Sequence, residues 1–484
     1  MSTSPLVGGT GSATPEYDAV IVGAGPNGLV AAARLATAGM RVLVLEAQTV
    51  AGGGLRTEEL TLPGFRHDVC SSVHALAQAS RAFRALQLDR EGLEFAHPRI
   101  PLAHPLEGGT AFLHRDLAET ARGLGRDGRA WSFVLGGVAH GRGGLVDSIL
   151  EPLRMPPLHP VALAGYGALG LWSASALGRT AFRGEKARAL FAGCSAHAIL
   201  PLESAGTSAY GMLLAGLAHA VGWPVAVGGS QSIADALVAR IEKLGGDVVT
   251  SSPVASLTDL PSTRAVLLDL TPRQVDAIAG DVLPAPYRDK LVAFRYGSGV
   301  FKVDYALDGP VPWRDPEVAD AGTVHLGGTA GEIAAGEAEV ARGGHPERPY
   351  VLVVQASQAD PTRAPAGKHT LWAYCHVPNG SRVDMASRIE AMIDEAAPGF
   401  RDLVLARHTM DTAALEAHNA NEIGGDISGG AGDWRQLLTR PVPSLSPWRT
   451  PVDGLYLCSA STPPGGGVHG MCGWNAASEV LERA

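Results

Sequence analysis

The chain contains 484 residues, which is too long for one ordinary hydrophobic core, so we expect two domains. Its formal net charge is −9 at pH 7 and it has no block of basic residues, which disfavours nucleic acid as a partner. The five cysteines are odd in number and form no CxxC pair, which argues against a disulfide framework, a redox-active dithiol and a zinc or other metal site.

The first residues carry no targeting pattern. Residues 1–15 are rich in serine, threonine, glycine and proline, and they lack the basic start and apolar core of a secretory signal. We therefore expect a disordered tail there and a cytoplasmic protein. The oligomeric state does not follow from the sequence.

The stretch after this tail has the order of a dinucleotide-binding βαβ unit. An apolar run at 19–22 predicts a buried strand, and residues 29–38 predict a helix that Gly39 ends. A second apolar strand is expected at 41–45, and Glu46 follows it directly. A Gly-x-Gly-x-x-Gly motif lies between the first strand and the helix, where a dinucleotide site requires it.

Each residue of this motif has a physical role. Gly23 permits the tight turn, Gly25 lets the backbone approach a diphosphate, and Gly28 lets the helix pack close to the strand. The amides at the helix start hold the diphosphate, and Glu46 can accept hydrogen bonds from ribose hydroxyls. The cofactor-binding residues expected here are Gly23, Gly25, Pro26, Asn27, Gly28, Glu46 and Ala47.

A second glycine-rich stretch follows at 50–57. It resembles the second glycine motif of phytoene desaturase-like flavoproteins and the flavin amine oxidase superfamily, where a glycine pair and an arginine cover the pyrophosphate and ribityl chain. The resemblance implies that Gly53, Gly54, Leu55 and Arg56 contact FAD. We expect the FAD to be bound without a covalent link, because neither Cys458 nor Cys472 lies in a pattern that suggests attachment. The sequence has neither a second Rossmann fingerprint nor a cysteine pair, so no NAD(P)H site is evident.

The middle of the chain returns to this domain. A helix at 233–244, ended by a glycine pair, is followed by strands expected at 247–250, 253–257 and 264–270. This order resembles the part of the superfamily's FAD domain that rejoins the sheet. The resemblance implies that a backbone group near Val254 contacts the adenine.

The C-terminal segment resembles the end of the same flavoproteins. A strand at 454–458 precedes a glycine-rich loop and a helix, which in that family pass the isoalloxazine ring. The acid that commonly follows this strand is absent, and Met471 stands about where amine oxidases place a cage tyrosine, which puts amine oxidation in doubt. The cofactor residues that the resemblance implies are Ser459, Gly467, Val468, His469 and Met471.

Two catalytic residues are expected. Lys302, in an apolar strand, matches the family lysine that holds a water near flavin N5, although an edge-strand lysine in solvent is the alternative. His469 lies in the glycine loop and can act as general acid or base, or as a hydrogen-bonded loop anchor.

Substrate contacts are expected from two segments. Alternation at 369–378 places Trp372, Tyr374 and His376 on one strand face, which suits a flat apolar substrate, although such a face is usually core. His74 lies among serines near the flavin loops and is the other substrate candidate, with a pinned loop as the alternative.

An apolar, glycine-rich segment at 160–177 stands out. It is short for a membrane span, and Arg179, Arg183, Lys186 and Arg188 follow it. We expect a helix buried over the substrate cavity, with a monotopic lipid contact as the alternative.

The sequence thus predicts an α/β fold with two discontinuous domains. A Rossmann-type FAD-binding domain is expected from residues 16–75, 215–285 and 445–484, and an α+β substrate domain from 76–214 and 286–444. The expected activity is hydride transfer between a CH–CH unit of a hydrophobic small molecule and flavin N5, with O2 or a quinone as acceptor. An amine or other C–N oxidase, a redox-neutral isomerase and an interaction protein without turnover stay open.

Overall fold

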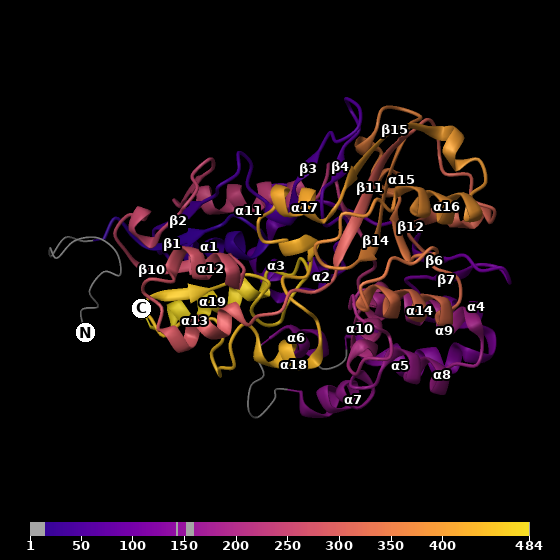
Figure 1. Ribbon diagram of the computed structural model, residues 1–484, viewed down its shortest axis with the longest axis horizontal. Helices are drawn as coiled ribbons and strands as arrows, with labels where there is room; N and C mark the ends of the chain where they lie inside the picture. Colours follow the sequence, from indigo (N-terminus) through magenta and orange to yellow (C-terminus); the bar gives the residue numbers. More distant parts are fainter. Residues whose placement is uncertain (1–14, 142–143, 152–158, 484) are drawn as a thin grey trace.

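The computed structural model describes residues 15–141, 144–151 and 159–483 (Figure 1). The tail expected at 1–15 lies, except for its last residue, outside the described residues. Figure 1 shows two sheets, one in each half of the molecule, with helices packed around them. The expected α/β fold, with a Rossmann-type domain and a second α+β part, is confirmed.

The first sheet has five parallel strands and draws on three distant parts of the chain. Its order is β16-β10-β1-β2-β9, with bounds Leu455–Leu457, Thr263–Leu268, Tyr17–Val22, Val42–Leu45 and Asp247–Val249. Its strands are short apolar runs because both faces of the sheet are covered. The domain boundaries expected from the sequence remain a proposal.

Helices cover both faces of this parallel sheet. One face packs against α1 (Pro26–Thr37), α11 (Gln231–Lys243) and α19 (Met471–Leu481), through Ile21 and Val44. The other face packs against α12 (Pro272–Ala279) and α13 (Ala285–Val292), which bury Val20 and Leu268. The strand carboxyl ends are left free for a ligand.

One expected strand of this domain is wrong. Residues 253–257 form no strand, because Ser256 caps the 3-10 turn Leu257–Asp259 through a capping box. The Asp259 carboxylate accepts hydrogen bonds from the amides of Ala255 and Ser256, which commits this backbone to a turn.

The second sheet has seven strands in the order β15-β11-β14-β13-β12-β6-β7. Neighbours are antiparallel except β12 and β6, which are parallel. The bounds of these strands are Val404–Met410, Gly299–Leu307, His369–Val377, Val351–Val354, Ala321–Leu326, Ile100–His104 and Ala111–Leu113.

The two faces of this sheet differ in chemistry. One face is apolar, includes Val303, Val353 and Ala373, and packs against α16 (Ala386–Ala396). The alternate residues point to the other side and include Trp372 and Tyr374. That side is covered by α14 (Ala330–Ala341), α9 (Glu185–Ala196) and α10 (Thr207–Ala220), with α5 (Gly128–Ala139) behind them (Figure 1).

Shorter elements connect these layers. The two-residue strands are β3 (Thr57–Glu58), β4 (His67–Asp68), β5 (Phe95–Ala96) and β8 (Val225–Ala226). The remaining α-helices are α2 (Ala75–Ala79), α3 (Arg81–Leu86), α4 (Leu117–Gly123), α6 (Leu145–Leu150), α7 (Pro160–Gly170), α8 (Ala174–Ala181), α15 (Ala356–Ala359), α17 (Thr412–His418) and α18 (Trp434–Thr439).

The apolar segment at 160–177 departs from expectation. It is not one buried helix, because α7 ends at Gly170 and, within its described residues, only that glycine is buried. Leu163 and Tyr166 face inward, whereas Val161 and Leu171 are exposed. Among the described residues no single helix is long and apolar enough to cross a bilayer, but α7 and α8, bent by 96° at their break, pass that length and composition test as a pair.

Candidate functional site

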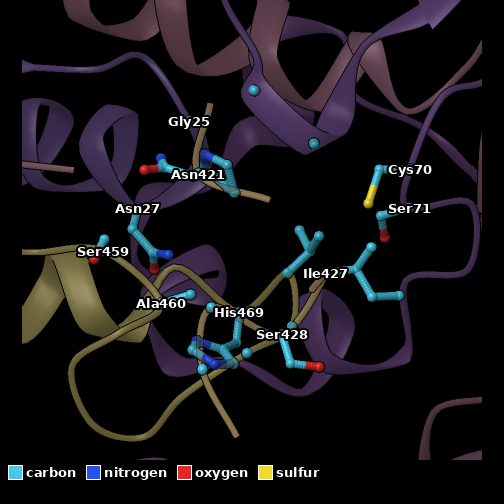
Figure 2. Close-up of a pocket in the computed structure, with 18 of the residues that line it drawn as sticks. Gly25, Asn27, Cys70, Ser71, Asn421, Ile427, Ser428, Ser459, Ala460 and His469 are labelled. Carbon is cyan, nitrogen blue, oxygen red and sulfur yellow. The ribbon is translucent and has the colours of Figure 1, made fainter. Parts of the chain in front are cut away.

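A cavity of about 970 Å³ lies between the two sheets. It extends from the loops at the carboxyl ends of β1 and β2 to the aromatic side of the seven-stranded sheet. Figure 2 shows Gly25, Asn27 and Ser459 around it, with Cys70 and His469 on other sides. Its volume is at the upper end of the range of about 300–1,000 Å³ for small-molecule sites.

The first glycine loop is shaped by close backbone contacts. Gly23 has φ +97°, which favours glycine. A Cβ on Gly28 would lie 2.2 Å from the Gly23 carbonyl oxygen, and one on Gly25 would lie 2.6 Å from Oδ2 of Asp269. The loop therefore requires glycine at all three positions. Gly23, Gly25, Pro26 and Asn27 line the cavity, whereas Gly28 serves packing behind it.

Glu46 directly follows β2 and lines the cavity. Its Oε2 accepts a hydrogen bond from the Ala24 amide at 2.8 Å, and its Oε1 accepts one from the Gln48 amide at 2.9 Å. These bonds fix the carboxylate beside the glycine loop, and further lone pairs stay available for hydroxyl donors. Glu46 and Ala47 both line the cavity, as does Val254 further along the same wall.

The second glycine motif lies against the first. Gly53 to Leu55 form a 3-10 turn, and a Cβ on Gly53 would lie 3.1 Å from the Gly25 Cα. Arg56 donates from Nε to the Gly53 carbonyl at 3.1 Å and from Nη2 to the His418 carbonyl. Gly53, Gly54 and Arg56 line the cavity, whereas Leu55 is fully buried in the core.

The C-terminal loop contributes Ser459, Gly467, Val468 and His469 to the cavity wall. Met471 is buried in the core of this domain and is not part of the lining. The Ser459 hydroxyl donates to the Leu270 carbonyl at 2.7 Å, which joins the loops that follow β16 and β10.

Both ring nitrogens of His469 are used within its own loop. Nδ1 accepts a hydrogen bond from the Met471 amide at 3.0 Å, and Nε2 lies 3.1 Å from the Gly465 carbonyl oxygen, to which it donates. Burial lowers the pKa of His469 to about 4. The geometry therefore favours a loop anchor, and a catalytic role for His469 stays an untested prediction.

Lys302 is buried in the centre of the seven-stranded sheet. Its ammonium forms an ion pair with Asp304, two residues along the same strand face. Lys302 is not among the residues that line the cavity, but its ammonium lies 5.9 Å from the ring of Trp372, which does line it. Burial raises the pKa of Asp304 to about 6 despite the lysine beside it. This placement favours a structural pair, and proton chemistry at Lys302 is untested.

Of the four expected substrate residues, two line the cavity and two do not. Trp372 and Tyr374 line the cavity, with their rings 5.1 Å apart at near right angles. His376 shares their strand face but contacts Glu337, with Nδ1 2.8 Å from Oε1. His74 lies 2.8 Å from the Ser230 hydroxyl and is outside the lining, and burial lowers its pKa to about 4.

Four carboxylic acids in the cavity wall were missed by the sequence analysis, namely Glu151, Asp269, Glu422 and Asp426. Asp269 accepts a hydrogen bond from the Gly28 amide at 2.8 Å, and burial raises its pKa to about 7. Burial also raises the pKa of Glu422 to about 7, and its Oε2 has no hydrogen-bond partner among the described residues. Asp269 follows β10, so its position at a strand end was a usable signal, whereas nothing near Glu422 marks it.

Comparisons with known proteins place the chain among relatives of similar length. Residues 21–87 match the family model of an NAD(P)-binding Rossmann-like domain. Pyridine nucleotide-disulfide oxidoreductase domain-containing protein 2 of Rattus norvegicus is 28% identical, over 98% of this chain and 95% of that protein. A limonene dehydrogenase polypeptide of Castellaniella defragrans is 34% identical over 24% of this chain and 21% of that protein.

Solved structures share the fold. Wild-type putrescine oxidase, determined with putrescine bound, superimposes with a TM-score of 0.61 at 19% identity and covers 96% of this chain and 99% of that one. The resemblance that the sequence motifs indicate is therefore confirmed. The chain is homologous to pyridine nucleotide-disulfide oxidoreductase domain-containing protein 2 over nearly its whole length, and it shares the fold of putrescine oxidase.

Proposed function

We propose that the protein is an FAD-dependent oxidoreductase that removes a hydride from a CH–CH unit of a hydrophobic small molecule. The observation that carries this proposal is that one continuous cavity joins the two glycine loops to the aromatic side of the seven-stranded sheet. One end offers backbone amides and the Glu46 carboxylate, and the other offers Leu213, Trp372 and Tyr374. A dinucleotide and an apolar substrate can therefore lie in contact.

The residues at the first end fit FAD. The start of α1 has Gly25 as its N-cap without a side-chain cap, so its amides and its positive dipole end suit a diphosphate. Glu46 suits the hydroxyls of an unphosphorylated ribose and repels a 2′-phosphate. When bound, the flavin supplies a two-electron acceptor.

We also propose that FAD is bound without a covalent link to the protein. Burial raises the pKa of Cys70, Cys458 and Cys472, so each is a neutral thiol and a poor nucleophile near neutral pH. Cys472 also lies within hydrogen-bond distance of the Thr462 carbonyl, which holds it within its loop.

Dehydrogenation of a CH–CH unit needs a base besides the hydride acceptor. One carbon loses a hydride, the adjacent carbon loses a proton, and a double bond forms between them. Glu422 is our candidate for the base, because it lines the cavity beside Gly54 and its pKa of about 7 leaves a useful fraction ionised at neutral pH. The two electrons pass on to O2 or a quinone, which completes the cycle.

Anaerobic flavin reduction tests this function. Protein loaded with FAD is mixed without oxygen with a monocyclic terpene hydrocarbon, or with putrescine, and the visible flavin band is followed. We expect bleaching by the hydrocarbon class and a reduction rate roughly a hundredfold lower in Glu422→Gln. Reduction by the amine alone would favour the C–N oxidase alternative, and no reduction by either would leave the redox proposal without support.

A further inference from the structure

The mouth of the cavity carries apolar side chains on its outer surface. Leu438 lines the cavity and is also 64% exposed, so the cavity reaches solvent beside it. Across this opening, Leu163 and Tyr166 of α7 line the inner wall. Exposed large apolar side chains lie on α7, on α18 and on the adjoining α5 and α7–α8 turn. These residues, here termed the apolar rim, are Phe133, Val161, Leu171, Trp172, Trp434 and Leu438.

These residues lie on adjoining elements. The Gly206 amide lies within hydrogen-bond distance of the Leu171 and Trp172 carbonyls, at 3.2 Å each, and a Cβ on Gly206 would lie 3.6 Å from the Trp434 Cβ. Phe133 is on α5, which packs against α7. Figure 1 shows α5, α7, α8 and α18 along the same lower edge of the molecule.

The exposure of the rim is high for side chains of this size. Val161 is 86% exposed, Phe133 79% and Leu171 67%. Scattered apolar residues are normal on a protein surface, but a group of them on adjoining elements beside a cavity mouth marks an interaction site.

The charge around the rim differs from that of the whole chain. The described residues between 120 and 190, which include α5, α7 and α8, contain seven Lys and Arg residues and four Asp and Glu residues, although the chain as a whole carries −9. Arg129 lies four residues before Phe133 on α5, and Arg435 adjoins Trp434. Like Arg179 and Arg183, both are exposed and form no salt bridge with another described residue.

We infer that the apolar rim docks on an anionic lipid bilayer, with the cavity mouth facing the acyl region. Apolar side chains surrounded by exposed cations match a negatively charged membrane surface. An apolar molecule dissolved in the bilayer could then enter the cavity without crossing water. The inference rests on the proposed function only in taking the substrate to be hydrophobic.

Vesicle flotation tests this surface. The full-length protein loaded with FAD is mixed with vesicles of phosphatidylcholine, or of an equimolar phosphatidylcholine and phosphatidylglycerol mixture, and the bound fraction is measured. We expect flotation with the anionic vesicles and less with the neutral ones. The double variant Val161→Gln/Leu171→Gln should lower the partition coefficient about tenfold or more, because each side chain loses its apolar burial.

A matched control removes exposed valines elsewhere. Val292 on α13 is 72% exposed and Val282 is 50% exposed, both in the dinucleotide-binding half. Val282→Gln/Val292→Gln should float like the wild type. Equal loss in both double variants, or no flotation of the wild type, overturns the inference. A wild-type dimer in sedimentation that becomes monomeric in Val161→Gln/Leu171→Gln would also overturn it, because a second copy would then cover the rim.

The flotation experiment tests the membrane surface, and FAD binding tests the proposed function, so the two results can fail independently. A protein that floats but takes up no FAD would remove the proposed function and leave the membrane surface in place. A protein that binds and reduces FAD but never floats would do the reverse.

Discussion

The five-stranded sheet and the seven-stranded sheet both border the cavity, but they present different parts of the chain to it. The parallel sheet presents strand ends, so its contribution is loop backbone, a helix start and the Glu46 carboxylate. The seven-stranded sheet presents a face, so its contribution is side chains such as Trp372 and Tyr374. A backbone site demands glycine at fixed spacing, whereas a sheet face accepts many residues.

The two sheets also differ in how they tolerate charge. Glu46 is held by backbone amides at the cavity edge, whereas Lys302 and Asp304 are buried as a pair in the middle of the other sheet. Breaking a buried pair leaves one uncompensated charge, which is costly. The following changes test whether each region depends on the feature assigned to it.

The largest expected effect is on the buried pair. Lys302→Met should lower the free energy of unfolding by about 3–5 kcal/mol, because Asp304 would lose its partner in the core. Chemical denaturation of the FAD-loaded protein measures this loss. The double variant Lys302→Met/Asp304→Leu should recover most of it; a Lys302→Met protein of normal stability that reduces its flavin slowly would instead support the lysine as a catalytic residue.

The next effect concerns cofactor affinity. Glu46→Ala should weaken FAD binding by about 1.5–3 kcal/mol, up to roughly a hundredfold, because charge-assisted hydrogen bonds to the ribose are lost. Glu46→Asp should be milder, since it keeps the charge. Titration of the apoprotein with FAD measures both, and unchanged affinity in Glu46→Ala would show that this carboxylate is not the ribose ligand.

A smaller effect is expected at the first glycine loop. Gly28→Ala should destabilise the protein by about 1–3 kcal/mol and weaken FAD binding, because the added Cβ would meet the Gly23 carbonyl oxygen at 2.2 Å. Gly136→Ala in α5 is the matched control, since its Cβ would meet no atom within 4 Å. Equal behaviour of the two variants in thermal unfolding and FAD titration would contradict this close packing.

The smallest effect is a pH dependence of stability. Burial lowers the pKa of several histidines, to about 3 or 4 in the group His67, His74, His104, His197, His219 and His469. In the unfolded chain these histidines take up a proton near pH 6.5, whereas in the folded protein they stay neutral until a much lower pH. Protonation therefore favours the unfolded chain, and the stability of the fold decreases as the pH falls below about 6.5. Burial acts oppositely on a smaller group of acids, raising the pKa of Asp304 to about 6 and that of Asp269 and Glu422 to about 7.

Because the histidines outnumber these acids, stability should decrease from pH 7 to pH 5. We expect Tm to fall by about 5 °C or more over this range. A Tm that rises as the pH falls would mean that the buried acids dominate.

The sequence predicts the parts of the site that depend on local backbone. Gly23, Gly25 and Glu46 lie within one βαβ unit, so their spacing along the sequence is enough to predict that they lie close together. Asp269 contacts Gly28 from 241 residues away, and no local pattern encodes that contact. Lys302 was placed correctly in a strand, but its partner is Asp304, which strand alternation puts on the same face and which the family motif does not mark.

The most direct test of the central claim, that the glycine-loop site binds one FAD without a covalent link, is to measure the flavin released on denaturation. The purified protein is denatured, and the flavin in the soluble fraction is identified and quantified against the chain. The account predicts about one FAD per chain, all of it released, as one glycine-loop site without a covalent link requires. A colourless protein that takes up no added FAD, or flavin that stays attached to the denatured chain, would contradict it.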